Sequence, residues 1–130
     1  MIVDHIGITC ADLDAAKRFY DAVLATLGHR RVMDVDVAVG YGSESPDFWL
    51  ARPEVEGVNR ETHVAFTAPD VESVHAFHAA AQGLGAETLH EPRLWPEYHP
   101  GYYAVFVRDP DGNNVEAVFH GGAPAGPIAD

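Results

Sequence analysis

The sequence contains one cysteine, Cys10, and few cationic side chains. A single cysteine excludes an internal disulfide framework and any zinc site that is built from several thiolates. Eight lysine and arginine residues stand against twenty aspartate and glutamate residues, so the formal net charge is -12. Nucleic acids and anionic membranes attract clustered cations. The composition therefore argues against a nucleic-acid partner and against adhesion to a membrane.

Long apolar runs are also missing from the sequence. No stretch approaches the roughly 20 apolar residues that cross a bilayer, and Met1–His5 lacks the basic and apolar regions of a secretory signal. We therefore expect a cytoplasmic protein. At 130 residues with 47% hydrophobic content, the chain is long enough for a sizeable core and falls within the usual size of one domain.

The sequence does contain an internal repeat. Residues His63–Thr67 match residues His5–Thr9 at a constant offset of 58 positions, and the match continues through Asp12 and Asp70 into the segments that follow. In both copies, a short apolar run precedes an aspartate that is a plausible N-cap for a helix. The repeat indicates an internal duplication of one structural unit.

Both copies predict the same order of elements: a strand, a helix and three further strands. In the first copy, a strand over 2–9 and a helix that stops at Gly28 precede strands over 30–34, 37–41 and 48–51. In the second copy, the expected elements are a strand over 63–67, a helix over 71–84, and strands over 87–90, 102–108 and 114–119. Asp109–Asn113 is a strong turn signal between the last two strands.

Three residues point to a metal site. His5 and His63 occupy the same position in the two copies, and Glu116 lies on the last predicted strand. Two imidazoles and one carboxylate can hold a divalent metal on one face and leave coordination positions open. Taken singly, each histidine also fits a hydrogen-bonded structural residue, and Glu116 also fits a solvent-facing position on an edge strand. The equivalence of the two histidines favours the metal site.

A long aromatic segment, residues 92–103, precedes the strand next to the one that carries Glu116. Long irregular segments are often functional lids, although ordinary loop packing fixed by three prolines fits as well. If the segment faces the metal, its His99, Tyr98 or Tyr102 is a candidate acid, base or substrate contact.

The sequence resembles the vicinal oxygen chelate superfamily, the group of glyoxalase I, extradiol dioxygenases, fosfomycin-resistance transferases and bleomycin-binding proteins. The resemblance covers residues 1–120 and rests on Asp4–Ile8, Phe19-Tyr20, Thr62–Phe66 and, most specifically, Phe106–Glu116. It implies an α+β fold in which two tandem βαβββ modules pair their sheets into a cupped, open barrel. We expect one domain over 1–130, with module one at about 1–52, module two at about 62–120 and a tail over 121–130.

The resemblance also implies a ligand set. The family's metal ligands fall on His5, His63 and Glu116, and the expected cofactor is a divalent metal such as Fe, Ni, Zn or Mn. The family's fourth ligand position falls on the segment Phe48–Arg52, which contains no carboxylate. A small-molecule substrate and a homodimer are expected, with the modules pairing either within one chain or between chains.

Three functions remain open. The first is a metal-dependent, glyoxalase-like lyase or isomerase whose substrate chelates the metal through adjacent oxygens, although the missing carboxylate counts against glyoxalase I itself. The second is an iron-dependent extradiol-type dioxygenase, whose two histidines and one glutamate are all present. The third is a non-catalytic drug- or metabolite-binding protein of the bleomycin-resistance kind, since an acidic chain attracts cationic ligands. Gly7 stands where fosfomycin transferases carry a threonine, which argues against transfer to fosfomycin.

Overall fold

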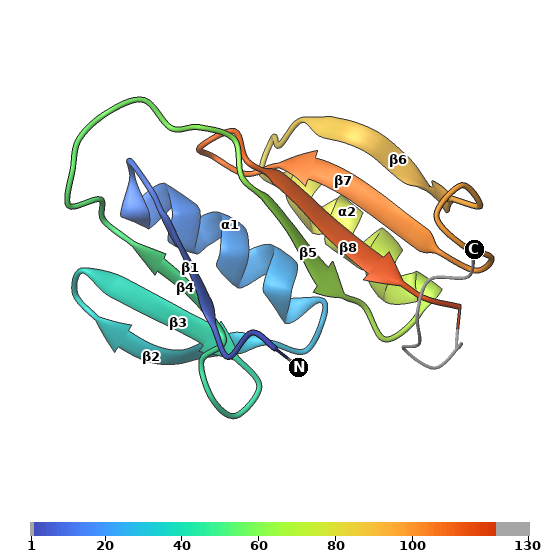
Figure 1. The fold of residues 1–130 in the computed structure, drawn as a ribbon, viewed down its shortest axis with the longest axis horizontal. Helices are drawn as coiled ribbons and strands as arrows, with labels where there is room; N and C mark the ends of the chain where they lie inside the picture. Colours follow the sequence, from blue (N-terminus) through green and yellow to red (C-terminus); the bar gives the residue numbers. More distant parts are fainter. Residues whose placement is uncertain (1, 122–130) are drawn as a thin grey trace.

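The computed structural model describes residues 2–121, so nearly all of the predicted tail over 121–130 lies outside the described residues. The chain forms two β-α-β-β-β modules in tandem (Figure 1). Module one contains β1 (Ile6–Thr9), α1 (Leu13–Ala25), β2 (Arg30–Val35), β3 (Ala38–Gly42) and β4 (Phe48–Ala51). Module two contains β5 (His63–Thr67), α2 (Val71–Gly83), β6 (Thr88–Leu94), β7 (Tyr103–Arg108) and β8 (Asn114–Phe119).

The two helices begin in the same way. The side chain of Asp12 accepts a hydrogen bond from the backbone N–H of Ala15, and the side chain of Asp70 accepts one from the N–H of Ser73. Each cap satisfies a backbone donor that the first helical turn leaves without a partner. Gly28 follows the end of α1 with a φ of 89°, a left-handed conformation that favours glycine. The predicted helix starts are confirmed.

Each module folds into its own four-stranded sheet. The strand orders are β1-β4-β3-β2 and β5-β8-β7-β6, and in both sheets the first and last strands of the module run parallel to each other. In module two, Ala65 pairs with Glu116, and in module one, Gly7 pairs with Trp49. Gly7 and Ala65 are equivalent in the repeat. Trp49 therefore occupies in module one the position that Glu116 occupies in module two.

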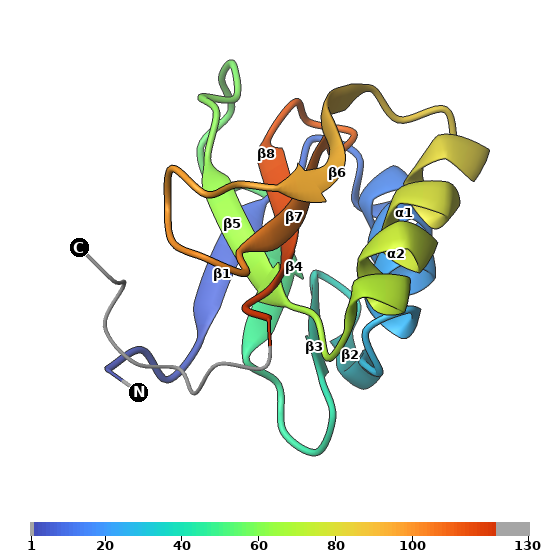
Figure 2. The same ribbon diagram turned by 90° about the vertical axis from the view of Figure 1, so that its right-hand side faces the viewer.

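Both helices cover the same face of the sheets, as the side view in Figure 2 shows. The helices contact each other, α1 packs on β2 and β4, and α2 packs on β6, β7 and β8. The main core lies between helices and sheets and draws on both modules, including Phe19, Leu24, Phe48, Val74 and Phe77. Each helix has 13 residues. Neither helix within residues 2–121 is long and apolar enough to cross a membrane.

The sheet face opposite the helices is open in the single chain. In β5, Val64 is buried in the core, whereas its neighbours His63 and Ala65 are exposed on the other face. The two sheets do not join into a closed barrel. The predicted α+β fold of two βαβββ modules with cupped, open sheets is confirmed.

A buried hydrogen bond ties module one to module two. The hydroxyl of Tyr20 in α1 donates to Oδ2 of Asp109 at 2.7 Å, in the predicted turn between β7 and β8. The Asp109 carboxylate also accepts hydrogen bonds from the N–H of Asp111 and from the backbone and side-chain nitrogens of Asn113. Burial and the neighbouring Asp109 carboxylate raise the pKa of Tyr20 well above its usual range, so its hydroxyl stays protonated and donates.

We expect Tyr20→Phe to lower the free energy of unfolding by about 1–3 kcal/mol, because a buried carboxylate loses a donor. The change is measured by urea denaturation. The matched control is Tyr103→Phe, which removes a hydroxyl contact to His75 near the surface and should cost about 0.5 kcal/mol or less. Equal losses in the two variants would contradict the role of the Tyr20–Asp109 bond as a link between modules.

Candidate metal centre

His63 and Glu116 lie next to each other on the open face of module two. Parallel pairing of β5 with β8 places Ala65 opposite Glu116, and His63 is two residues earlier on the same face of β5. Nε2 of His63 is 3.1 Å from Oε1 of Glu116. The glutamate is 2% exposed, whereas the histidine side chain is 49% exposed. The pair therefore joins a buried carboxylate to an imidazole that solutes can reach.

The second ring nitrogen of His63 determines what the first can do. Nδ1 lies 3.1 Å from the carbonyl oxygen of Asn114, which can only accept a hydrogen bond, so Nδ1 carries a hydrogen. In the neutral ring, Nε2 then presents its lone pair to the Glu116 carboxylate. Two electron-rich atoms in this position need a cation between them, either a proton or a metal ion. Metal-binding imidazoles commonly donate their other N–H to a carbonyl in this way.

Tyr102 holds the other oxygen of Glu116. Its hydroxyl donates to Oε2 while Oε1 faces His63, so both carboxylate oxygens have partners. Burial raises the pKa of Glu116, and the hydrogen bond from Tyr102 and the nearby His63 oppose that rise. Burial and the glutamate also raise the pKa of Tyr102 above its usual range. The phenol consequently remains a donor and orients the carboxylate.

The predicted aromatic segment lies beside this pair. A cavity of about 290 Å³ is lined by His63, Tyr98, Tyr102, Phe106 and Glu116. Trp95 anchors the segment: its indole N–H donates to the carbonyl of Ala104, and its ring stacks on Tyr98 at a centroid distance of 5.8 Å. The structure thus brings Tyr98 and Tyr102 to the histidine–glutamate pair.

His99 is not among the residues that line the cavity. Its Nδ1 lies 2.7 Å from the carbonyl of Pro100, and its Nε2 lies 2.9 Å from Nδ1 of His120. Its ring meets the ring of Tyr102 edge to face at 5.3 Å. The structure therefore places His99 behind Tyr102, where it contacts the cavity wall and not the cavity itself.

His5 lies apart from the pair in the single chain. β1 and β5 run in opposite directions (Figure 1), and His5 lines a separate cavity of about 320 Å³ together with residues 64–67 of β5. His63 begins that same strand. Nδ1 of His5 is 2.6 Å from the Asp4 carboxylate, and its side chain is 59% exposed. Within residues 2–121, no group of three His, Cys, Asp or Glu side chains converges as a metal site.

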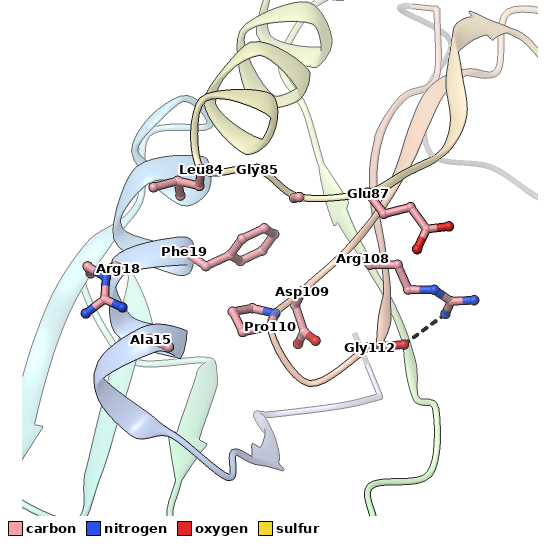
Figure 3. Close-up of a pocket in the computed structure, with 11 residues that line it drawn as sticks. Ala15, Arg18, Phe19, Leu84, Gly85, Glu87, Arg108, Asp109, Pro110 and Gly112 are labelled. Atoms are coloured by element: carbon pink, nitrogen blue, oxygen red, sulfur yellow. Dashed lines mark hydrogen bonds between the residues drawn. The ribbon is translucent and has the colours of Figure 1, made fainter.

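A larger cavity, of about 580 Å³, lies on the helix side of the molecule, between α1, the end of α2 and the β7–β8 turn (Figure 3). It contains two arginines but none of the predicted site residues. Arg108 is paired with Glu61 and donates to the carbonyl of Gly112. Arg18 lies on the opposite side of the cavity from Arg108 (Figure 3), so the two cations do not converge on one ligand position. The open face of module two remains the better candidate.

The sequence interpretation missed two features of the site. The repeat offset of 58 positions leads from Glu116 to Val58, outside the strands, so only strand pairing reveals Trp49 as the equivalent residue. The hydrogen bond from Tyr102 to Glu116 joins neighbouring elements whose side-chain directions the sequence does not specify. The signal for Tyr102 was its place in the aromatic segment.

The chain matches the family model of the Glyoxalase/Bleomycin resistance protein/Dioxygenase superfamily over residues 2–117, and it belongs to this family. The predicted resemblance is therefore confirmed at the level of the superfamily. None of the curated proteins matches the sequence significantly.

Solved structures extend the comparison. A glyoxalase/bleomycin resistance protein from Albidiferax ferrireducens is 30% identical, with a TM-score of 0.81 over 92% of this chain and 99% of that one. A lactoylglutathione lyase from Agrobacterium tumefaciens is 26% identical, with a TM-score of 0.67 over 92% of both chains. The fosfomycin resistance protein FosX from Mesorhizobium loti is 17% identical, with a TM-score of 0.65 over 92% of this chain and 93% of that one. The last likeness concerns the fold alone.

The raised pKa of Glu116 predicts a pH dependence of stability in the metal-free protein. Between the ordinary value of 4.5 and the raised folded value, the folded chain binds more protons than the unfolded chain, so the free energy of unfolding falls as pH rises. We expect Glu116→Gln to remove this part of the slope in urea denaturation between pH 4.5 and neutrality. Glu44→Gln, in the β3–β4 loop, is the control. An unchanged slope in Glu116→Gln would contradict the assignment.

Proposed function

We propose that this chain is a divalent-metal-dependent enzyme of the glyoxalase type, a lyase or isomerase whose small substrate chelates the metal through adjacent oxygens. In this proposal His5, His63 and Glu116 hold the metal, which is Fe, Ni, Zn or Mn. The observation that carries the proposal is the His63–Glu116 pair, in which a buried carboxylate faces the lone-pair nitrogen of an imidazole at 3.1 Å.

The donor atoms of this pair fit a metal ion. Two ligands that bind one ion at about 2.1 Å and at right angles lie about 3 Å apart, close to the observed separation. Imidazole nitrogen with a carboxylate oxygen suits the first-row divalent metals. The carbonyl of Asn114 on Nδ1 of His63 and the hydroxyl of Tyr102 on Glu116 are the outer partners that orient such ligands.

We propose that a second copy of the chain supplies His5. Two copies related by a twofold axis can face module one of each copy toward module two of the other, which completes two equal sites. The exposed Gly7 and Ala65 on the open faces of β1 and β5 support this arrangement, because a single chain leaves them uncovered. The Asp4 carboxylate at Nδ1 of His5 leaves Nε2 available for a cation.

When bound, the metal supplies Lewis-acid polarisation of the chelating oxygens, which contributes several kcal/mol to lowering the barrier. The protein orients this centre. Tyr102 keeps Oε2 of Glu116 occupied, so that Oε1 stays directed toward His63. Tyr98 and Phe106 line the cavity beside them and exclude water from the substrate. We assign Tyr98 and Tyr102 as substrate contacts.

A lyase or isomerase also needs a group that moves a proton. Apart from the two proposed ligands, the cavity is lined by Tyr98, Tyr102 and Phe106, none of which is a carboxylate or an imidazole. The raised pKa of Tyr102 keeps its phenol protonated, and its hydroxyl donates to Glu116, so it is not the group that accepts a proton. We propose His99, which lies behind Tyr102 and pairs with His120, as the acceptor.

The same observation favours a second candidate, an iron-dependent extradiol-type dioxygenase. His5, His63 and Glu116 would hold the iron, which would supply binding of a chelating substrate and of dioxygen. The chain then has to bind and orient the substrate. Such a reaction does not require a further carboxylate or imidazole in the cavity lining besides the two proposed ligands. A non-catalytic binder of a cationic drug or metabolite remains the third outcome, and the net charge of -12 supports it.

We expect His5→Ala, His63→Ala and Glu116→Ala each to lose most of the bound metal of the purified protein, measured by elemental analysis after dialysis. Tyr102→Phe should keep the metal but bind it about 10-fold to 100-fold more weakly, as a change in an outer partner does. Glu44→Gln is the control for general damage. Wild-type metal content in all three alanine variants would disprove the site.

Mixed dimers test whether two copies share the site. Co-expressed His5→Ala and Glu116→Ala chains, purified through two different tags, form a hybrid in which one site keeps all three ligands. We expect this hybrid to hold about half of the wild-type metal, since a twofold dimer has two sites. A hybrid of His63→Ala with Glu116→Ala is the matched control, because both of its sites stay defective. Equal metal content in the two hybrids would exclude a shared site.

Activity distinguishes the three candidate functions. The metal-free protein is loaded anaerobically with Fe(II), Ni(II), Zn(II) or Mn(II) and assayed with hemithioacetals and with catechols. A lyase or isomerase converts hemithioacetals without oxygen, whereas a dioxygenase consumes oxygen with catechols and requires iron. Activity should disappear in Glu116→Ala. Inactivity with every metal, together with binding of a cationic drug, would support the binder.

A further inference from the structure

We propose that Trp49 forms the wall of the site opposite Glu116, and that the natural ligand carries a planar aromatic ring next to its metal-chelating oxygens. The inference rests on the proposed site shared between two copies. It adds the class of substrate and a residue that selects it.

The position of Trp49 follows from strand register. Trp49 pairs with Gly7 across β1 and β4, as Glu116 pairs with Ala65 across β5 and β8. Because Gly7 and Ala65 are equivalent in the repeat, His5 and Trp49 are related to each other as His63 and Glu116 are. Module one thus presents an imidazole and an indole where module two presents an imidazole and a carboxylate.

The packing around Trp49 directs its ring to the open face. Its strand neighbours Phe48 and Leu50 are buried in the core, so the intervening side chain points away from the helices. The ring lies over Gly40, where an added Cβ would come within 3.0 Å of two ring carbons and 2.6 Å of the Pro46 side chain. Glycine at this position lets the indole lie close against the sheet. Trp49 remains half-buried, with ring surface left to contact a ligand.

In the proposed dimer, the module that brings His5 to the metal site of the second copy also brings Trp49. His5 directly precedes β1, and Trp49 lies on β4, which pairs with β1 from Ile6 onward. In the proposed dimer the two residues therefore face the second copy together. Trp49 then arrives where symmetry with Glu116 would place a fourth ligand. An indole N–H is a donor only and does not bind a metal as a carboxylate does. This side of the site is consequently closed by an apolar plane.

An apolar plane beside a chelating centre selects a flat ligand. Aromatic rings pair favourably in offset-stacked or edge-to-face geometry, and such pairs stabilise a complex beyond the area they bury. Module two contributes Phe106 and Tyr98 to the other side of the site. A ligand ring held between these side chains and Trp49 keeps its attached oxygens directed at the metal. A short aliphatic chelator can contact the metal, but it lacks the ring that would contact Trp49, Phe106 and Tyr98.

Two hydroxamates test the inference, because they share one metal-chelating group and differ in the ring. Binding of acetohydroxamate and benzohydroxamate to the zinc-loaded dimer is measured by calorimetry. We expect benzohydroxamate to bind about tenfold more tightly to the wild type. Trp49→Leu should abolish the preference for benzohydroxamate over acetohydroxamate, whereas Trp49→Phe should keep most of it.

A second variant tests the position of Trp49 independently of any ligand. Trp49→Glu places a carboxylate in the fourth ligand position, so we expect zinc to transfer to a competing chelator at least about tenfold more slowly than from the wild type. The control is Ala51→Glu, because Ala51 is half-buried like Trp49 and lies two residues further along β4. Trp95→Glu is not a suitable control because Trp95 is buried.

The outcomes separate the inference from the proposed function. If acetohydroxamate binds but the ring adds nothing, or if the preference survives in Trp49→Leu, the inference is overturned and the metal site stands. Unchanged zinc release from Trp49→Glu overturns the position of Trp49 in the same way. If neither hydroxamate binds the zinc-treated protein and zinc is not retained, the proposed function fails, and the inference fails with it.

Discussion

The carboxylate of Glu116 lies in the interior of a β-sheet, where burial disfavours its charged form and both oxygens need partners. Tyr102 satisfies one oxygen, and the other faces His63. The tyrosine belongs to the aromatic segment and the histidine to β5. The contacts of one carboxylate therefore join two separate parts of the cavity wall. Trp95 then secures the aromatic segment against β7 through the carbonyl of Ala104.

The two modules share a backbone and differ in the side chains that they present. At one register position, module one carries Trp49 between Gly7 and Gly40, and module two carries Glu116 beside Phe106. Gly40 leaves room for the indole against the sheet, and Phe106 lies opposite Glu116 in the pairing of β7 with β8. In the proposed site, module one would therefore supply an apolar wall beside its histidine and module two a carboxylate beside its histidine, without a change of topology.

The repeat made the fold predictable, because helix caps and apolar spacing are local signals. Asp12 and Asp70 cap helices at the predicted starts. Which side chains contact each other depends instead on the register between strands that are far apart in the sequence, as for His63 and Glu116. Strand register produces no periodic pattern that a sequence analysis could detect. The residues of the candidate site were therefore predictable one by one. Their contacts, and the separate location of His5 in one chain, required the structure.

The opposite directions of β1 and β5 place His5 and His63 in different cavities of one chain. In the proposed dimer, which divides the ligands between two copies, metal binding and chain association would be linked equilibria, and each would strengthen the other by the same factor. Dilution would then release metal, and loss of metal would loosen the dimer. The amount of protein in the cell would set the active fraction, in addition to the supply of the ion.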